Sequence, residues 1–127
     1  MEMIFILQTG VLFVTALIHV YVFALESFLW QKPSTRKAFK TSEEEARLSA
    51  GLAYNLGFYN LFLALGLFYG IWLGQPGLVM TNYIMCFVFG AGMVLFVSRP
   101  QMRMSSLYQL APPVLYFILK SIGNRMI

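Results

Sequence analysis

The sequence predicts an all-α, polytopic membrane protein, folded as a bundle of four transmembrane helices. Of its 127 residues, 59% are hydrophobic and only 11% are charged, whereas soluble domains carry about a quarter charged residues. The apolar residues form separate runs, and three of these reach the roughly 20 helical residues that a bilayer core of ~30 Å requires. Most charged residues lie between the runs. Lipid is therefore the expected solvent of a single transmembrane domain over residues 1–127.

The first helix is expected at about residues 3–30. Its apolar run continues to Leu25 and no Lys or Arg precedes it, so the segment indicates a retained helix rather than a cleaved signal peptide. Trp30 marks its end, since tryptophan is enriched at membrane interfaces. The polar stretch that follows contains Pro33 and several basic residues, and it predicts a basic cytoplasmic loop over residues 31–42.

The second helix is expected at about residues 43–74. Thr41 and Ser42 precede three glutamates, and hydroxyl side chains followed by acids cap the free N–H groups at a helix start and suit the positive end of its dipole. The acids should therefore extend this helix into the cytoplasm.

The third and fourth helices are expected at about residues 78–97 and 106–122. Gln75-Pro76-Gly77 is a turn sequence that separates the third from the second, and Pro100 ends the third. The fourth run is the shortest, because Pro112 and Pro113 interrupt it and Lys120 limits its apolar length. The long side chain of Lys120 is expected to reach the outer interface.

The distribution of basic residues predicts the orientation. In a four-helix topology, the loops after the first and third helices share one side of the membrane, and cytoplasmic loops carry an excess of Lys and Arg. Seven basic residues lie on that side and two on the other: Lys32, Arg36, Lys37, Lys40, Arg47, Arg99 and Arg103 against Lys120 and Arg125. We therefore expect a multi-pass protein of the cell membrane, with residues 31–49 and 98–105 in the cytoplasm and both termini outside.

Composition narrows the partners and the chemistry. The net charge of +4 is expected to meet anionic lipid headgroups rather than nucleic acid, because the sequence has no basic stripe with interleaved aromatics. A single histidine and a single cysteine on different helices make a metal site improbable, and they exclude a bis-histidine haem site within one chain. Hydrolase, phosphate-loop and zinc-protease motifs are absent. We expect no metal and no cofactor.

Small residues recur every fourth position on two of the predicted helices. Gly66, Gly70 and Gly74 do so on the second, and Cys86 and Gly90 do so on the third. Small residues at this spacing let helix backbones approach closely, so these faces are expected to be helix contacts. The contacts can be within one chain or between copies, so a homo-oligomer stays open.

Two ionisable residues lie inside the first predicted helix, His19 and Glu26. A charge within a span costs at least ~2.5 kcal/mol on insertion scales, so each needs a partner or a function. The two are seven residues apart and therefore share nearly one face, about two turns from each other. A polar strip of the first helix is thus expected to face inward.

Polar residues on the second helix offer a matching surface, namely Tyr54, Asn55, Tyr59 and Asn60. Depths counted from the cytoplasmic helix ends at ~1.5 Å per residue predict two layers. One pairs Glu26 with Asn55 or Tyr59, and the other pairs His19 with Asn60 or Tyr59. These five residues are the candidate binding site for a small ligand.

Each of these residues also has a purely structural interpretation. Glu26 can be an interfacial carboxylate that reaches Lys32 or Arg36, or a buried acid that only holds helices together; the functional alternative is a proton-exchanging or substrate-binding carboxylate. His19 can be a neutral imidazole bonded across helices or an active base. Amides and tyrosines in spans commonly serve as interhelical hydrogen bonds.

Three short motifs resemble a known family. They are His19-Val20-Tyr21 followed by Glu26-Ser27-Phe28-Leu29-Trp30, then Asn55-Leu56-Gly57-Phe58-Tyr59-Asn60-Leu61-Phe62-Leu63-Ala64, and later Gln109-Leu110-Ala111-Pro112. In combination they resemble the domain of unknown function 1304 family of small four-helix membrane proteins, over nearly the whole chain. Leu110 stands where that family has Gly, and Leu56 where it often has Gln. The resemblance implies a fold and positions of interest, and no reaction.

Three functional hypotheses follow from these residues. The leading one is a module that binds or transports a small lipophilic or cationic compound, because an inward acid among aromatic side chains suits a cation by charge and by quadrupole attraction. The second is a small membrane enzyme that uses Glu26 and His19 as acid and base on a lipophilic substrate. The third is a structural or assembly subunit whose polar layers only specify packing.

Overall fold

The expectation of an all-α chain is confirmed by the computed structural model, which describes residues 1–125 and contains helices and no strand within them. The α-helices are α1 (Glu2–Ser27), α2 (Pro33–Phe39), α3 (Glu43–Leu48), α4 (Ala50–Leu73), α5 (Leu78–Ser98) and α6 (Arg103–Arg125). Two 3₁₀ turns, η1 (Gln75–Gly77) and η2 (Pro100–Met102), join α4 to α5 and α5 to α6.

The predicted basic loop contains a short helix. α1 ends at Ser27, before Trp30, and α2 occupies much of the stretch expected to be a loop over residues 31–42. Pro33 starts α2, where its missing N–H costs nothing and its fixed φ suits a helix. Lys40 ends α2 in the left-handed conformation, with φ 54°. The basic residues of this stretch therefore lie on or next to a short helix rather than in an extended loop.

The helix expected over residues 43–74 is two helices, with a break at Ser49. α3 begins with the expected capping box: the Ser42 side chain accepts from the Glu45 N–H, and the Glu45 carboxylate accepts from the Ser42 N–H at 2.8 Å. α4 starts afresh at Ala50. The Ser49 hydroxyl donates to the Glu45 carbonyl and accepts from Trp30 Nε1 at 3.1 Å, so it joins the end of α3 to the chain after α1.

α6 is longer than expected and continues through both prolines. It begins at Arg103 rather than near residue 106 and extends to Arg125 rather than to residue 122. Pro112 and Pro113 lie inside it, and the two missing N–H groups leave the carbonyls of Tyr108 and Gln109 without their usual helical donors. Pro113 is buried, so the second proline packs against the rest of the bundle.

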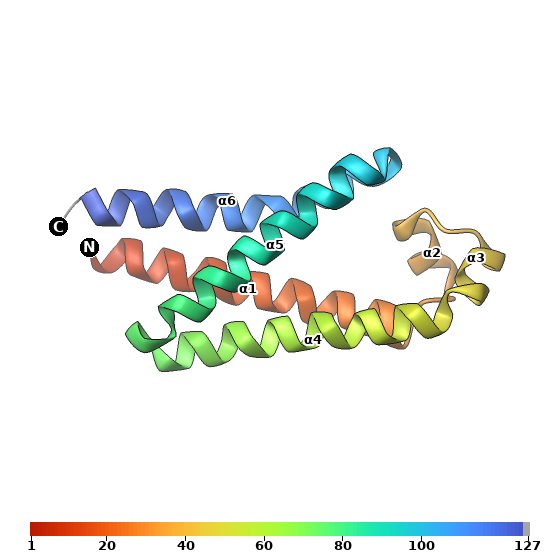
Figure 1. Ribbon diagram of the computed structural model, residues 1–127, viewed down its shortest axis with the longest axis horizontal. Helices are drawn as coiled ribbons and strands as arrows, with labels where there is room; N and C mark the ends of the chain where they lie inside the picture. The colour runs from red at the N-terminus through yellow and green to blue at the C-terminus, as the bar shows by residue number, and fades with distance from the viewer. Residues whose placement is uncertain (126–127) are drawn as a thin grey trace.

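The long helices form an elongated bundle. α1 packs against α4 and α6, and α5 packs against α6 and α4. In Figure 1, α6 runs beside α1, and the two chain ends lie together at one end of the molecule while α2 and α3 cap the other. α4 and α5 meet at η1 and diverge from it toward the α2–α3 end (Figure 1).

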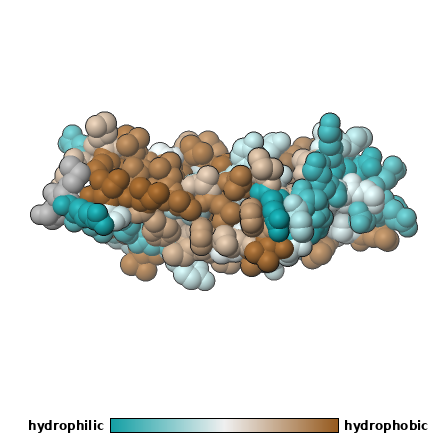
Figure 2. Space-filling model, turned by 90° about the horizontal axis from the view of Figure 1, so that it is seen from above, coloured by the Kyte–Doolittle hydropathy of each residue, from teal (hydrophilic) through white to brown (hydrophobic). Residues whose placement is uncertain are grey.

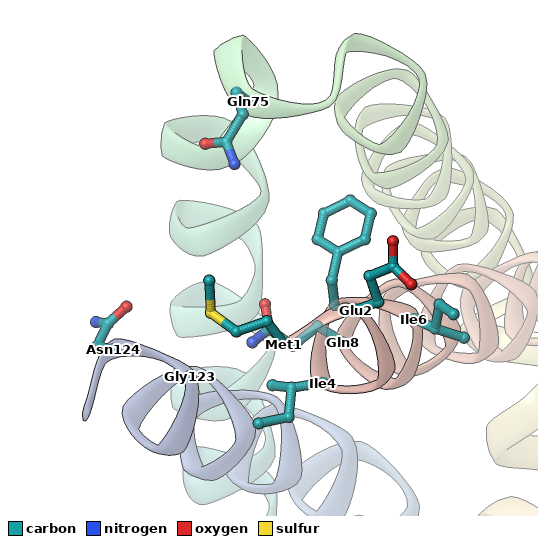
Figure 3. A pocket seen from close by; sticks show the side chains of 9 residues that line it. Met1, Glu2, Ile4, Ile6, Gln8, Gln75, Gly123 and Asn124 are labelled. Carbon is teal, nitrogen blue, oxygen red and sulfur yellow. The ribbon is translucent and has the colours of Figure 1, made fainter. Parts of the chain in front are cut away.

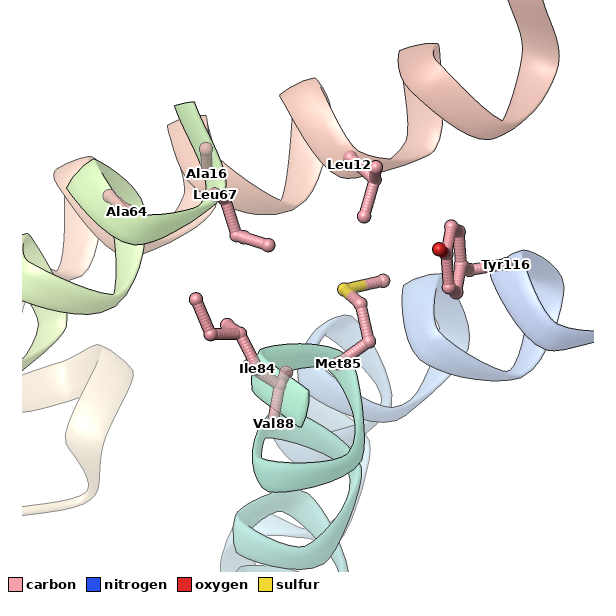
Figure 4. Packing of buried hydrophobic residues seen from close by; sticks show 8 residues of the cluster. All are labelled: Leu12, Ala16, Ala64, Leu67, Ile84, Met85, Val88 and Tyr116. Carbon is pink, nitrogen blue, oxygen red and sulfur yellow. The ribbon is translucent and has the colours of Figure 1, made fainter. Parts of the chain in front are cut away.

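The core lies where the four long helices meet, and it mixes small and large apolar side chains (Figure 4). Its buried residues are Leu12, Ala16, Ala64, Leu67, Ile84, Met85, Val88 and Tyr116. Ala16 and Ala64 are fully buried, so α1 and α4 approach closely at this level. The Tyr116 ring brings a hydroxyl group into the same cluster.

The expectation for the small-residue faces is half right. A Cβ on Gly66 would meet the Ile84 side chain, and one on Gly70 would meet Thr81 and Gly77, so these glycines do lie at the contact between α4 and α5. Gly90 has nothing within 4 Å of an added Cβ, and Cys86 is exposed. Cys86 and Gly90 therefore do not lie in a close contact between helix backbones.

Within residues 1–125, three helices are long and apolar enough to cross a membrane, namely α1, α4 and α5 with η1. α6 is long enough but is not among them, because it carries serines, a glutamine and basic residues. Figure 2 shows hydrophobic side chains over the middle of the molecule and hydrophilic ones gathered mainly at the end formed by α2 and α3. A bilayer requires a hydrophobic surface of this kind, so together with the apolar helices it indicates a membrane protein.

Candidate functional site

The central polar contact joins Glu26 of α1 to Asn60 of α4. Asn60 Nδ2 donates to Glu26 Oε2 at 2.8 Å and also to the Leu56 carbonyl of its own helix at 3.2 Å. Both side chains are half-buried. The amide is thus fixed between its own backbone and the acid, with its donors turned toward α1.

The pairing of Glu26 with Asn55 or Tyr59 that the depths predicted does not occur, for a geometric reason. Side chains on a helix lean toward its N-terminus. Since α1 and α4 run in opposite directions, Glu26 leans deeper into the bundle while Asn60 leans toward the α2–α3 end. The two side chains therefore meet across about one helical turn of axial offset.

Asn55 lies on the outer side of α4, and Tyr59 lies at the edge of α4 that borders the groove toward α5. Asn55 is exposed and Tyr59 is 65% exposed. The buried side of α4 is marked instead by Ala53, Gly57 and Ala64. Asn60 lies three, four or seven residues from each of these, so it shares their side of the helix, whereas Asn55 lies nearly opposite. Asn55 therefore does not share a side of α4 with Asn60.

His19 is buried but bonded within its own helix. Its side chain is 3% exposed, and Nδ1 lies 2.9 Å from the Thr15 carbonyl oxygen. A carbonyl only accepts, so Nδ1 carries the proton and a neutral ring leaves its lone pair on Nε2. No hydrogen bond joins His19 to Asn60 or Tyr59, so the second predicted layer does not form. The ring packs in the bundle instead.

No basic side chain pairs with Glu26. The ion pairs found in residues 1–125 are Arg36 with Glu43 at 3.8 Å and Arg47 with Glu44 at 4.0 Å, both at the α2–α3 end. The structural interpretation in which Glu26 reaches Lys32 or Arg36 is therefore wrong for this conformation. The acid has an amide donor and no cationic partner among the described residues.

A groove of about 560 Å³ borders this contact on the side where α4 and α5 diverge. Its lining is mostly apolar, with Asn60 and Gln109 as the amides and Tyr59 as the phenol. The remaining lining residues are Leu56, Phe62, Leu63, Ile84, Phe87 and Ala91. An apolar groove with a few polar groups, one of them bonded to an acid, is the usual form of a small-molecule site.

A second hollow of about 580 Å³ continues toward the α2–α3 end. Leu52 and Leu95 line it, one helical turn beyond Leu56 and Ala91 of the first groove, so the same stripes of α4 and α5 bound both. Its rim carries Trp30, the Glu45 carboxylate and the Arg99 guanidinium. Hydrogen bonds from Ser42 lower the pKa of Glu45, and the positive charge of Arg99 adds to this shift. The mouth of the groove is thus charged with both signs.

A polar cluster at the opposite end was missed by sequence reasoning. Tyr116 Oη and Lys120 Nζ of α6 both donate to Asn82 Oδ1 of α5, each at 2.8 Å. Lys120 was interpreted as a residue that reaches the interface alone. Its spacing of four from Tyr116, and the presence of a single amide near the start of the partner helix, were the available signals.

A further hollow of about 620 Å³ lies at the end where the chain termini meet (Figure 3). Glu2, Gln8, Gln75 and Asn124 give it polar walls from α1, η1 and α6. It holds none of the five candidate residues and lies away from the contact between Glu26 and Asn60.

Comparison with known proteins identifies the family and nothing closer. No curated protein and no solved structure matches the chain. A family model described as a protein of unknown function, DUF1304, matches residues 13–120. This range includes α4, α5 and both polar clusters, and it confirms the resemblance that the three motifs indicated. The chain therefore belongs to the DUF1304 family.

Proposed function

We propose that the protein binds a small lipophilic cation in the groove between α4 and α5, next to Glu26. The observation that carries this proposal is the Glu26 carboxyl group, which receives one amide donor from Asn60 and has no basic side chain within 4.0 Å among residues 1–125. An acid without a countercharge inside a bundle favours a cation as its partner. The aromatic rings of Tyr59 and Phe87 along the groove add quadrupole attraction.

The form of the groove supports a lipophilic ligand over a water-soluble one. Its walls are largely apolar side chains of α4 and α5, and α5 diverges from α4 toward the α2–α3 end (Figure 1). A ligand dissolved in the membrane can therefore enter from the side, and one that comes from water meets the charged mouth of Glu45 and Arg99 first.

A pair of ions with the same shape and opposite charge tests the proposal. Purified protein in lipid nanodiscs is titrated with tetraphenylphosphonium and with tetraphenylborate. We expect saturable binding of the cation, no saturable binding of the anion, and at least tenfold weaker cation binding in Glu26→Gln. Glu2→Gln, which removes a carboxylate from the same helix outside the groove, is the matched control and should keep wild-type affinity. Equal affinity of Glu26→Gln and wild type would overturn the proposal.

Transport is tested separately in proteoliposomes. If binding leads to passage across the membrane, entry of tetraphenylphosphonium into vesicles with protein should exceed entry into empty vesicles at equal potential, and Glu26→Gln should remove the excess. Binding without excess entry would restrict the function to a binding module.

We also propose that α6 crosses the membrane as a fourth span, with residues 31–49 and 98–105 in the cytoplasm and both termini outside. Its 23 residues measure about 34 Å at 1.5 Å per residue, and it packs along α1 and α5. Single cysteines at Lys37 and Asn124, in a Cys86→Ser background, test this with a membrane-impermeant maleimide. The two should be labelled from opposite sides of the membrane, and labelling from the same side would contradict the fourth span.

A second candidate function is acid–base catalysis on a lipophilic substrate. It is favoured by His19, whose Nδ1 donates to Thr15 while no described residue bonds to Nε2. The axial separation of His19 and Glu26 is ~10 Å, so a substrate would have to bridge them. Incubation with membrane lipids followed by mass spectrometry distinguishes the two functions. A protein-dependent product lost in both His19→Asn and Glu26→Gln supports catalysis, and unchanged lipid contradicts it. If neither variant alters binding or chemistry, a structural subunit is the remaining hypothesis.

A further inference from the structure

The cluster at the end of α5 and α6 is built only from hydrogen-bond donors around one acceptor. Asn82 Oδ1 receives Tyr116 Oη and Lys120 Nζ, each at 2.8 Å. A lysine ammonium has no acceptor, so the amide atom that faces Lys120 must be the oxygen. The Asn82 Nδ2 group therefore points away from both partners.

The donors that remain have no partner within residues 1–125. No hydrogen bond to Asn82 Nδ2 is found there, and the atom is not among the fully buried ones. No carboxylate of the described residues lies within 4.0 Å of Lys120. The half-buried Lys120 side chain thus has no anionic partner among these residues, and it lies beside an Asn82 amide group whose N–H donors bond to none of them. A ligand for this cluster must bring anionic oxygen.

An apolar groove of about 610 Å³ begins one helical turn from the cluster. It lies on the seam between α5 and α6, and it is lined by Cys86, Phe89, Val114, Phe117, Ile118 and Ser121. Cys86 is one turn, about 6 Å, from Asn82 along α5, and Ser121 directly follows Lys120. The Lys120–Asn82 cluster suits the phosphate group of a phospholipid, and the adjoining apolar groove suits one of its acyl chains.

The position of the cluster along the helices fits the depth of a headgroup. Asn82 lies about 6 Å from the start of α5, and Lys120 lies about 8 Å from Arg125 at the end of α6. Both are thus near the membrane face at which the chain termini lie (Figure 1), while the groove extends toward the middle of the bilayer. A soluble phosphate would fill the polar part and leave the apolar part empty.

We propose that the seam between α5 and α6 is a binding site for one anionic phospholipid. Lys120 and the Asn82 amide hold its phosphate group, and one acyl chain lies in the groove along Cys86 and Phe117. Basic pockets between membrane helices bind anionic headgroups in this way. The site shares no residue with the groove beside Glu26, so it stands or falls independently of the proposed function.

Native mass spectrometry tests the site on the full chain. The protein is released from nanodiscs made of equal amounts of phosphatidylglycerol and phosphatidylcholine with identical acyl chains. We expect one retained phosphatidylglycerol per chain, at least fivefold in excess over phosphatidylcholine. Lys120→Gln should remove the excess, and Lys120→Arg should keep it. Arg125→Gln, with the same loss of charge at the same end, should leave it unchanged.

Two further measurements keep the proposal falsifiable if Lys120→Gln folds poorly. Cys86→Trp fills the groove and leaves the charge, so it should reduce retained phosphatidylglycerol at least fivefold. Inorganic phosphate at about 10 mM, in a buffer at the physiological ionic strength of about 0.15 M, should displace none of it. Equal retention of the two lipids, equal losses in Lys120→Gln and Arg125→Gln, or displacement of the lipid by free phosphate would each overturn the proposal.

Discussion

The two polar clusters of the bundle are built alike, one around an acid and the other around a base. At the α1–α4 contact, an amide of Asn60 donates to the carboxylate of Glu26, and at the α5–α6 contact, an amide oxygen of Asn82 accepts from Lys120 and Tyr116. Each cluster joins two helices and leaves one ionisable group without a countercharge among residues 1–125. A membrane protein satisfies most polar groups internally, so the groups left over indicate where a ligand belongs.

The largest expected effect is on the free energy of unfolding, and it tests whether the α1–α4 contact is packed more tightly than the α5–α6 contact. A Cβ on Gly57 would meet Ser27 Oγ, and it would lie 3.0 Å from the Phe23 carbonyl oxygen and from the Ser27 backbone nitrogen. Backbone atoms cannot move aside, so Gly57→Ala should force α1 from α4 and cost about 1–3 kcal/mol of unfolding free energy. Thermal unfolding in detergent measures this.

Two other glycines serve as controls for Gly57→Ala. Gly51 lies on the same helix with nothing within 4 Å of an added Cβ, so Gly51→Ala should be neutral or stabilising by up to about 1 kcal/mol. At the α5–α6 contact, an added Cβ on Gly92 meets side chains and no backbone atom, Leu110 at 2.9 Å and Gln109 Cβ at 3.5 Å. The Leu110 side chain can rotate, so Gly92→Ala should cost less than Gly57→Ala. The reverse order would contradict the difference in packing.

The next effect concerns the basic cluster. Tyr116→Phe removes the hydroxyl group that donates to Asn82 and keeps the ring in the core, so it should lower the unfolding free energy by about 1 kcal/mol. Tyr83→Phe is the control, because Tyr83 is 70% exposed on the same pair of helices, and it should change stability by less than about 0.5 kcal/mol. Equal effects of the two variants would show that the hydrogen bond contributes nothing.

A smaller effect, the coupling energy between two side chains, tests whether Asn60 is the hydrogen-bond partner of Glu26. In a double-mutant cycle, Glu26→Leu and Asn60→Leu should couple by about 0.6 kcal/mol, the average for interhelical hydrogen bonds in a membrane. The cycle of His19→Leu with Asn60→Leu should show no coupling, because His19 bonds to Thr15 of its own helix. Unfolding in mixed micelles gives both values. Coupling of His19 and Asn60 above that of Glu26 and Asn60 would restore the pairing expected from depth.

The smallest expected effect is on the pKa of Glu45, at the charged rim of the second hollow. The hydrogen bonds from Ser42 lower the pKa of Glu45, so the capping box stabilises α3 above the ordinary pKa of a glutamate and loses this contribution as the pH falls through the lowered value. In Ser42→Ala, the pKa of Glu45 should rise part of the way toward its ordinary value, because the hydroxyl group is lost while the backbone N–H of residue 42 remains. Carbon-detected NMR titration of the carboxyl group measures the change, and an unchanged pKa would contradict the capping role.

Much of the fold follows from the sequence because length and hydropathy determine where helices can lie in a bilayer. The capping box at Ser42 was predictable because its spacing has one local solution. The break at Ser49 and the helix α2 were not, since both depend on how Trp30 and the basic turn pack at the end of the bundle. Local propensity does not determine contacts of that kind.

The candidate site was predictable in its acid and not in its partner. His19 and Glu26 share a face of α1 with buried Thr15 and Ala16, as their spacing indicated. On α4, residue type alone grouped Asn55 with Asn60, although five positions turn a helix by about 140°. The glycine and alanine residues at 53, 57 and 64 identify the buried stripe, and they would have selected Asn60. The basic cluster was missed because its two halves lie 38 residues apart in the chain.

The turn between α4 and α5 has a mechanical consequence. Gly77 packs directly on the backbone of Gly70, and Gly74 adopts a positive φ of 65°, so the two helices pivot about a tight, glycine-built elbow. α5 is about 31 Å long, and a swing of only about 5° at the elbow displaces Ser98 by about 3 Å. Such a rotation of α5 would widen or narrow the groove beside Asn60 by roughly the radius of a methyl group, while the backbone of the turn itself scarcely changes.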